Sequence, residues 1–238
     1  MTTAGMRDTQ IGETPLVSTI STTRRFLLGC GVFSSVLYIG TDLIGGLRYD
    51  GYSFVSQAIS ELSAVGAPSK PFVDPLFSAY NLLALMFGFG VYQTALAGRN
   101  RALRFSAIAL ICYGTIGVLT GTLGSFFSMQ QRGTGSLATD APHIVLTGVL
   151  VLLLLLAIGF SAFALGNRFR AYSLTTLGTM IVFGALTIPF AARLAAGEPT
   201  VGMGIVERID VYSALLWVAV LSIALISRPD ATAQRRLQ

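Results

Sequence analysis

Six long apolar runs, separated by short polar segments, constrain the fold of this chain more than any other feature. A helix needs about 20 apolar residues to cross the hydrocarbon core of a membrane, with a usable range of roughly 17–25. We therefore predict an all-α polytopic membrane protein, a six-transmembrane-helix bundle. Its predicted spans are Phe26–Leu47, Leu76–Leu96, Phe105–Ser128, His143–Leu165, Tyr172–Ala192 and Ile209–Ser227.

Composition agrees with a lipid environment. Only 11% of the residues are charged and 53% are hydrophobic, whereas about 25% of the residues in a soluble domain are charged. We assign residues 24–228 to one transmembrane domain. Residues 1–23 are polar, rich in threonine and without periodicity, which predicts a disordered cytoplasmic tail. Residues 229–238 form the predicted C-terminal cytoplasmic tail.

The basic residues predict the orientation. Most arginines lie in the two tails and in the loops after the second and fourth spans, all on one side of the membrane. The positive-inside rule therefore places both termini in the cytoplasm. The same bias accounts for the net charge of +5 without a nucleic-acid partner. The opposite side carries only Arg48, Lys70, Arg132, Arg193 and Arg208.

Metal and disulfide chemistry receive no support from the sequence. Cys30 and Cys112, the two cysteines, both fall inside apolar runs, and His143 is the single histidine. This pattern has no zinc-ligand spacing and no disulfide framework. We predict no metal site and no cofactor.

The longest loop, Arg48–Pro75, lies on the predicted outer side. Loops of this length without structure are uncommon unless they are functional. At 100° per residue, one face of a helix in this loop is apolar and the other is polar, so we predict an amphipathic outer-loop helix at the membrane surface or capping the bundle. Its apolar face consists of Phe54, Val55, Ala58, Ile59 and Leu62.

Small residues also form a stripe in the third span. Gly114, Gly117, Gly121 and Gly124 recur at helical spacing on one face. Such stripes allow close helix packing in membranes, and can also line a lipid-binding groove. We favour close packing against a neighbouring helix.

Ionisable residues near the outer ends of the spans are the candidate functional groups. Asp42 is the deepest of them and needs either a partner or a water-filled pocket. Glu207 and Asp210 are neighbours on one helix face, where acidic residues also suit the first turn of a helix. Arg208 can snorkel to the surface, or hold a carboxylate or phosphate with two hydrogen bonds.

His143 stands at the head of the fourth span, behind Asp140. It is interpreted either as a structural histidine or as an acid/base group that acts with Glu61 or Asp42. A hydrolase would also need a nucleophile, and Ser60 beside Glu61 is only one of many serines.

Several of these segments together resemble a family. They are Gly51-Tyr52, Ile59-Ser60-Glu61-Leu62-Ser63-Ala64, Gly66-Ala67-Pro68, the lone His143, and Gly204-Ile205-Val206-Glu207-Arg208-Ile209 leading to Trp217. This set resembles DUF998, a family of bacterial and archaeal integral membrane proteins, over roughly residues 26–227. The resemblance implies a six-helix membrane protein without an established activity. We expect this protein in the plasma membrane, as a multi-pass protein. The family's polar, acid-containing end of the third span is replaced here by Phe126-Phe127-Ser128-Met129.

The sequence thus predicts a polar pocket at the outer face, roofed by the loop helix. Its predicted ligand-binding residues are Asp42, Glu61, His143, Glu207 and Arg208. We expect it to bind a membrane lipid headgroup or a small polar or anionic ligand, in envelope biogenesis or transport. Two alternatives stay open, a membrane-embedded hydrolase with a His/carboxylate site and a structural partner subunit. Whether the protein is an enzyme is left open.

Overall fold

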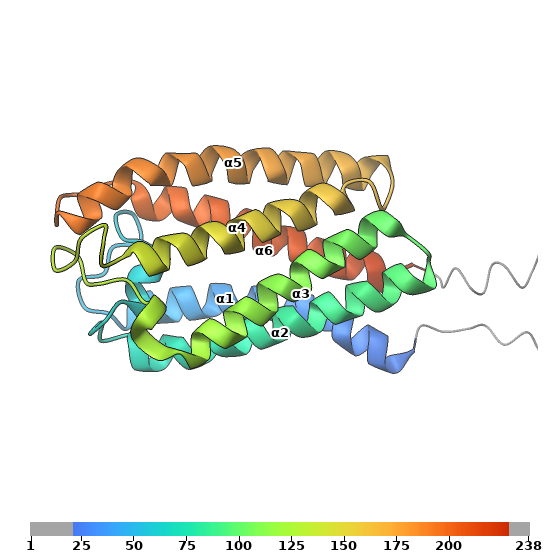
Figure 1. The fold of residues 1–238 in the computed structure, drawn as a ribbon, viewed down its shortest axis with the longest axis horizontal. Coiled ribbons are helices and arrows are strands. Elements are labelled where there is room, and N and C mark those ends of the chain that lie inside the picture. Colours follow the sequence, from blue (N-terminus) through green and yellow to red (C-terminus); the bar gives the residue numbers. More distant parts are fainter. Residues whose placement is uncertain (1–20, 229–238) are drawn as a thin grey trace, which may run out of the picture.

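Every regular element in the computed structural model, which describes residues 21–228, is helical (Figure 1). Most of both predicted tails lies outside the described residues. The first helix begins at Thr22, within the segment assigned to the N-terminal tail, with the Ser21 hydroxyl accepting a hydrogen bond from the Arg24 amide at 3.3 Å. The elements are α1 (Thr22–Leu47), η1 (Ile59–Ser63), α2 (Lys70–Ala97), α3 (Arg101–Thr122), η2 (Gly124–Phe127), α4 (Ala141–Ser161), α5 (Asn167–Ala195) and α6 (Met203–Ile226).

The six α-helices are the six predicted spans. They are 21 to 29 residues long and apolar enough to cross a membrane, which at 1.5 Å per residue exceeds the roughly 30 Å of a hydrocarbon core. Large apolar side chains cover their outer surface, including Phe33, Leu152 and Ile188. This confirms the fold class that the apolar runs predict.

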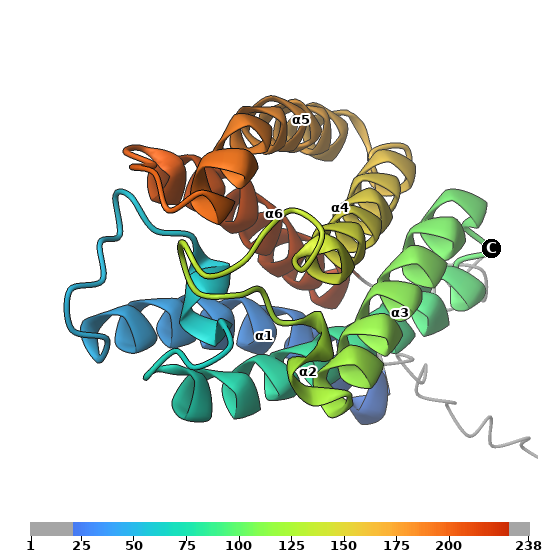
Figure 2. The same cartoon turned by 60° about the vertical axis from the view of Figure 1, so that its left-hand side comes forward.

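The helices form a ring in chain order, in which each packs on the next and α6 returns to α1 (Figure 2). They run alternately up and down. Segments 48–69, 123–140 and 196–202 meet at one end, which we name the loop end, and lie at the left in Figure 1. The opposite end, where α1 begins and α6 finishes, is the termini end.

The packed core lies nearer the termini end. Its largest buried members come from the first part of α1 and the last parts of α2 and α6, namely Leu28, Phe87, Trp217, Leu221 and Leu225. The Trp217 indole N–H donates to the Ser173 hydroxyl at 3.0 Å, which ties α6 to α5. The half of the ring toward the loop end is less filled, and the candidate site lies there.

The glycine stripe of α3 packs against α2, as predicted. A Cβ added at Gly114 would lie 2.5 Å from the backbone nitrogen of Leu85, and one at Gly88 would lie 2.9 Å from that of Ile111. Only glycine permits this approach of the two backbones. The stripe ends before Gly124, where a φ of +61° ends the helix, so α3 stops at Thr122 and not at Ser128 as predicted.

The predicted outer-loop helix is shorter than expected. Only Ile59–Ser63 is helical, as the 3₁₀ turn η1, although Ala58, Ile59 and Leu62 are buried as the apolar face requires. Val55, assigned to the same face, is 46% exposed. The reason lies in the backbone carbonyls of Phe54, Ser56 and Gln57, which accept hydrogen bonds from side chains of distant segments and are not used in a helix.

Candidate functional site

A buried ion pair joins α1 to α6 close to the loop end. Asp42 is fully buried, and its two carboxylate oxygens accept hydrogen bonds from Arg208, from Nε at 2.9 Å and from Nη2 at 2.7 Å. The Tyr212 hydroxyl donates to the same carboxylate at 2.6 Å. This two-point geometry is the strongest form of an arginine–carboxylate contact. The deep position of Asp42 is therefore explained by a partner.

Arg208 uses its other N–H groups to hold the loop. Its Nη1 donates to the carbonyls of Phe54 and Gln57 at 3.0 Å and to that of Gly204 at 3.1 Å. Its Nη2 also donates to the Tyr52 hydroxyl at 2.8 Å. Burial raises the pKa of Tyr52, while the neighbouring guanidinium acts in the opposite direction. A guanidinium has five N–H donors, so Arg208 has none left for an anionic ligand.

Glu61 and Arg132 form a second buried pair. Glu61 is 4% exposed, and its Oε1 accepts from Arg132 Nη2 at 2.8 Å and from the Ala58 amide at 2.9 Å. Arg132 also donates to the Thr200 hydroxyl at 2.8 Å and to the Glu198 carbonyl at 3.1 Å. This pair therefore joins three segments of the loop end, 48–69, 123–140 and 196–202.

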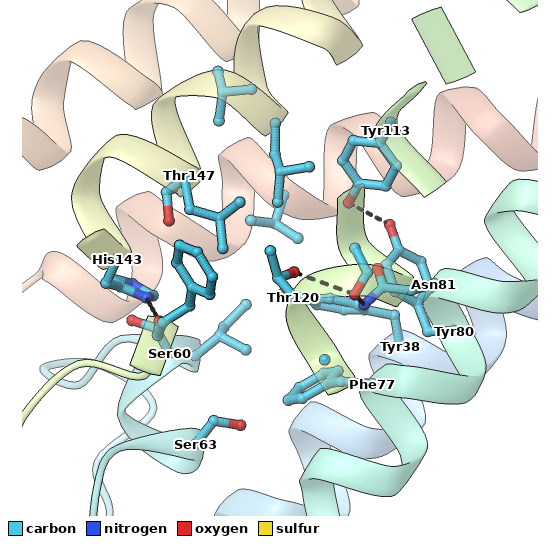
Figure 3. Close-up of a pocket in the computed structure, with 18 of the residues that line it drawn as sticks. Tyr38, Ser60, Ser63, Phe77, Tyr80, Asn81, Tyr113, Thr120, His143 and Thr147 are labelled. Atoms are coloured by element: carbon cyan, nitrogen blue, oxygen red, sulfur yellow. Dashed lines mark hydrogen bonds between the residues drawn. The ribbon is translucent and has the colours of Figure 1, made fainter. Parts of the chain in front are cut away.

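A cavity of about 330 Å³ lies inside the ring, on the side of these two ion pairs that faces the middle of the bundle (Figure 3). Its end toward the loops is lined by polar side chains, including Ser60 and Ser63 of η1. Toward the middle of the bundle it is lined by aromatic and then aliphatic residues of all six α-helices. The ionisable side chains in its wall, tyrosines apart, are Asp74, His143, Glu207 and Asp210. The aliphatic part includes Leu150, Leu154, Met180, Ala214 and Val218.

Two carboxylates of α6 belong to this wall. Glu207 Oε2 accepts a hydrogen bond from the Ile59 amide at 2.6 Å, at the start of η1. Asp210 is only 7% exposed, and its Oδ1 is buried without any hydrogen-bond partner among the described residues. The sequence placed both in the first turn of the sixth helix. In fact α6 begins at Met203, six residues before the predicted start at Ile209, so neither residue caps the helix.

Some hydroxyl groups of the wall are satisfied by neighbours and others are not. Tyr80 and Tyr113 share a hydrogen bond of 2.8 Å, and Asn81 donates to the Gly117 carbonyl at 3.2 Å (Figure 3). A second group of hydroxyls also lines the cavity, but its members make no hydrogen bond within residues 21–228. They are those of Tyr38, Ser60, Ser63, Ser78 and Thr147. These groups are available to a ligand.

His143 lies in the cavity wall at the start of α4. Its Nδ1 is 3.0 Å from the carbonyl of Phe127 in η2. A carbonyl only accepts, so Nδ1 carries a proton and Nε2 is the acceptor of the neutral ring. No carboxylate of the described chain makes an ion pair or hydrogen bond with His143. Across residues 21–228, no group of three His, Cys, Asp or Glu side chains is placed to hold a metal ion.

The sequence profile of a family described as a protein of unknown function, DUF998, matches residues 32–224. The chain belongs to the DUF998 family. The match covers α2 to α5 completely and most of α1 and α6, and it confirms the resemblance found in the sequence. Comparison with curated proteins and with solved structures gives no match.

The structure of this DUF998 protein divides the five predicted site residues into two sets. Asp42, Glu61 and Arg208 lie in the two ion pairs that fix the loops, and they do not line the cavity. Glu207 and His143 line the cavity. The ligand-binding role of all five stays a prediction. The His/carboxylate convergence expected of a hydrolase is not present in the described chain.

Sequence reasoning missed Arg132 as the partner of Glu61. A buried glutamate requires a cation, but the predicted outer side offered five basic residues, and nothing in their spacing singled out Arg132. For Asp210, the sequence left a first-turn capping role open beside a role in the site. A signal for the earlier helix start is Gly202, because glycine is one of the residues accepted at a helix N-cap.

Proposed function

We propose that this DUF998 protein binds a membrane lipid or a related amphipathic molecule, with its polar group at the loop end of the cavity. The observation that carries the proposal is the polarity of the cavity wall. Serines, a histidine and carboxylates line one part, and leucine, valine and methionine line the other. A headgroup and the first part of a hydrocarbon chain match these two surfaces in that order.

A path for the rest of the lipid's hydrocarbon chain supports this assignment. A second, apolar groove lies between α3 and α4 and is lined by Phe126, Pro142, Val145 and Val149, among others. It shares lining residues with the cavity, namely Thr120, Phe127 and Leu146. Val145 and Val149 are exposed on the lipid-facing side of α4. A hydrocarbon chain that leaves the cavity between α3 and α4 would therefore meet the apolar side chains of this groove before it enters the bilayer.

The other two functions predicted from the sequence receive less support. A hydrolase needs an acid/base partner for His143, which bonds instead to a backbone carbonyl. A partner subunit needs an exposed stripe of small residues, whereas Gly114 and Gly117 of α3 pack on α2. Lipid binding uses the features that remain, which are the cavity and its free hydroxyl groups.

Native mass spectrometry of the purified full chain tests the proposal. Thr147 faces the cavity from α4, while Leu152 on the same helix is 56% exposed and lines neither cavity nor groove. We expect a lipid adduct on the wild type and on Leu152→Trp, and loss of most of that adduct in Thr147→Trp, because an indole fills the cavity. Equal retention by the two variants, or no adduct on any of the three, would contradict lipid binding at this site.

A further inference from the structure

Within residues 21–228, the cavity wall contains carboxylates but no lysine or arginine side chain, and this charge balance favours one kind of polar group in a ligand. Building on the proposed lipid site, we infer that its ligand carries an ammonium group, held by Asp210 and Glu207 of α6. The substrate class is thus an amine-bearing amphiphile. The step beyond lipid binding is the identity of the headgroup.

Asp210 is the first reason. Its Oδ1 is buried and accepts no hydrogen bond from the described residues, yet the residue lines the cavity. It lies in the third turn of α6, beyond the reach of the helix dipole, which acts on the first turn. A carboxylate removed from water needs a proton or a cation to balance it. The side chains around it supply neither a hydrogen bond nor an ion pair.

The second reason is that the nearby cations are already used. Arg208 and Arg132 give their N–H groups to Asp42, Glu61 and loop carbonyls, and they do not line the cavity. Lys70 Nζ contacts Asp74, the Ser63 carbonyl and the Ser128 hydroxyl. Glu207 and Asp210 therefore share the cavity with no unpaired lysine or arginine. An anionic headgroup would meet these two carboxylates there, while Asp74, the third carboxylate of the wall, is already paired with Lys70.

The third reason is the size and lining of the space. A cavity of about 330 Å³ is far larger than a single water molecule or monatomic ion needs. Tyr38 packs against Phe77 and Tyr80, with ring centroids 4.9 and 4.8 Å apart, and all three line the cavity. Aromatic faces attract ammonium groups. The free hydroxyls of Tyr38 and Thr147 can accept its N–H bonds.

The test compares two single-chain probes on the full-length protein in digitonin, a bulky neutral detergent. n-Decylamine is protonated at pH 7, as a lysine side chain is, and 1-decanol has the same chain without charge. Titration of thermal stability gives an apparent affinity for each probe. We expect n-decylamine to bind the wild type at least tenfold more tightly than 1-decanol does. Asp210→Asn or Glu207→Gln should each remove most of this preference without changing the shape of the cavity.

Asp50→Asn is the matched control, because Asp50 is an exposed carboxylate of the loop end that lies outside the cavity. It should bind both probes as the wild type does. Equal binding of the two probes, abolished by Thr147→Trp, would leave the lipid site intact and overturn the ammonium inference. An equal loss of preference in Asp50→Asn would overturn it too, as non-specific charge attraction. Binding of neither probe, or binding that survives Thr147→Trp, would overturn the site itself.

Discussion

At the scale of single residues, Asp42 and Arg208 show how a charge deep in a membrane helix is made tolerable. A buried ion pair offsets its desolvation only when its remaining hydrogen-bonding groups are satisfied. Here the carboxylate also accepts from Tyr212, and the guanidinium donates to Tyr52 and to the carbonyls of Phe54, Gln57 and Gly204. The pair therefore fixes where the 48–69 segment sits above the cavity.

Removal of both partners should cost less than the sum of the two single removals. Arg208→Gln leaves Asp42 buried and unpaired, so we expect a loss of about 3–5 kcal/mol in the free energy of unfolding. The double variant Asp42→Asn/Arg208→Gln should lose less than the sum of the single losses, with a coupling of about 1–3 kcal/mol. Reversible unfolding in mixed micelles measures the free energy of unfolding of Asp42→Asn, Arg208→Gln and the double variant.

A second cycle on Glu61 and Arg208 is the control for this coupling. These two side chains share no direct hydrogen bond or ion pair within the described structure. Both contact Gln57, so we expect a coupling that is clearly smaller than that of Asp42 and Arg208 and not zero. A coupling as large as that of Asp42 and Arg208 would mean that the two ion pairs act as one network.

The need of Asp42 for a partner could be predicted from the sequence, but neither the burial of Glu61 nor its partner could be. The depth of Asp42 in an apolar run required a counter-charge or water, and Arg208 was already a candidate. Glu61 gave no such lead to Arg132, because that contact depends on how three loops fold over one another. The capping role open to Asp210 depended on a sixth span that begins at Ile209, whereas α6 begins at Met203.

At the scale of elements, η1 is a short turn that docks by two side chains. Leu62 is fully buried and Ile59 is 2% exposed, both within one apolar cluster with Val73 of α2. The same cluster touches Tyr38 and Tyr52, so η1 packs beside the cavity wall. Its position links the loop to the α1–α2 contact.

Leu62→Asp should destabilise the protein much more than Val55→Asp does. The first variant buries an unpaired carboxylate at a cost of several kcal/mol, while Val55 is 46% exposed and its aspartate stays in contact with solvent. A continuous amphipathic helix, as the sequence predicts, would make the two variants similar, because both positions lie on its apolar face. Thermal unfolding of the two purified variants distinguishes the short turn η1 from the longer helix. Equal losses of thermal stability would contradict the short turn and favour the longer helix.

The helices themselves were predictable because span length depends on local composition alone. The limits of the elements were not, since they depend on distant donors and on single glycines. Carbonyls of the 54–57 segment accept from Arg208, Arg132 and Thr200, which prevents the longer helix. Gly124, with its positive φ, ends α3 earlier than its apolar run does.

At the scale of the whole molecule, the largest apolar core lies toward the termini end and the cavity lies toward the loop end. Toward the termini end, Leu28, Phe87 and Trp217 belong to one continuous core. Toward the loop end, two ion pairs fasten the loops over a cavity. The fastened loops keep the polar wall in place, while α4 and α5, with few buried residues, face the lipid. A fixed roof over the cavity, with an apolar groove between α3 and α4 beside it, agrees with the proposed lipid ligand.

The orientation of this molecule in the membrane decides which compartment the roof faces, and we predict that it is the outside of the cell. At the loop end, Lys70, Arg132 and Arg208 are paired with carboxylates, whereas the termini end carries the larger set of arginines that the positive-inside rule counts.

Cysteines introduced at Asp50 and at Ala97 mark the two ends, because both positions are exposed. The background should carry Cys112→Ala, since that native thiol is also exposed, while Cys30 is buried. An impermeant thiol reagent applied to whole cells should label Asp50→Cys and leave Ala97→Cys unlabelled until the cells are opened. The reverse pattern would invert the topology and place the cavity on the cytoplasmic side.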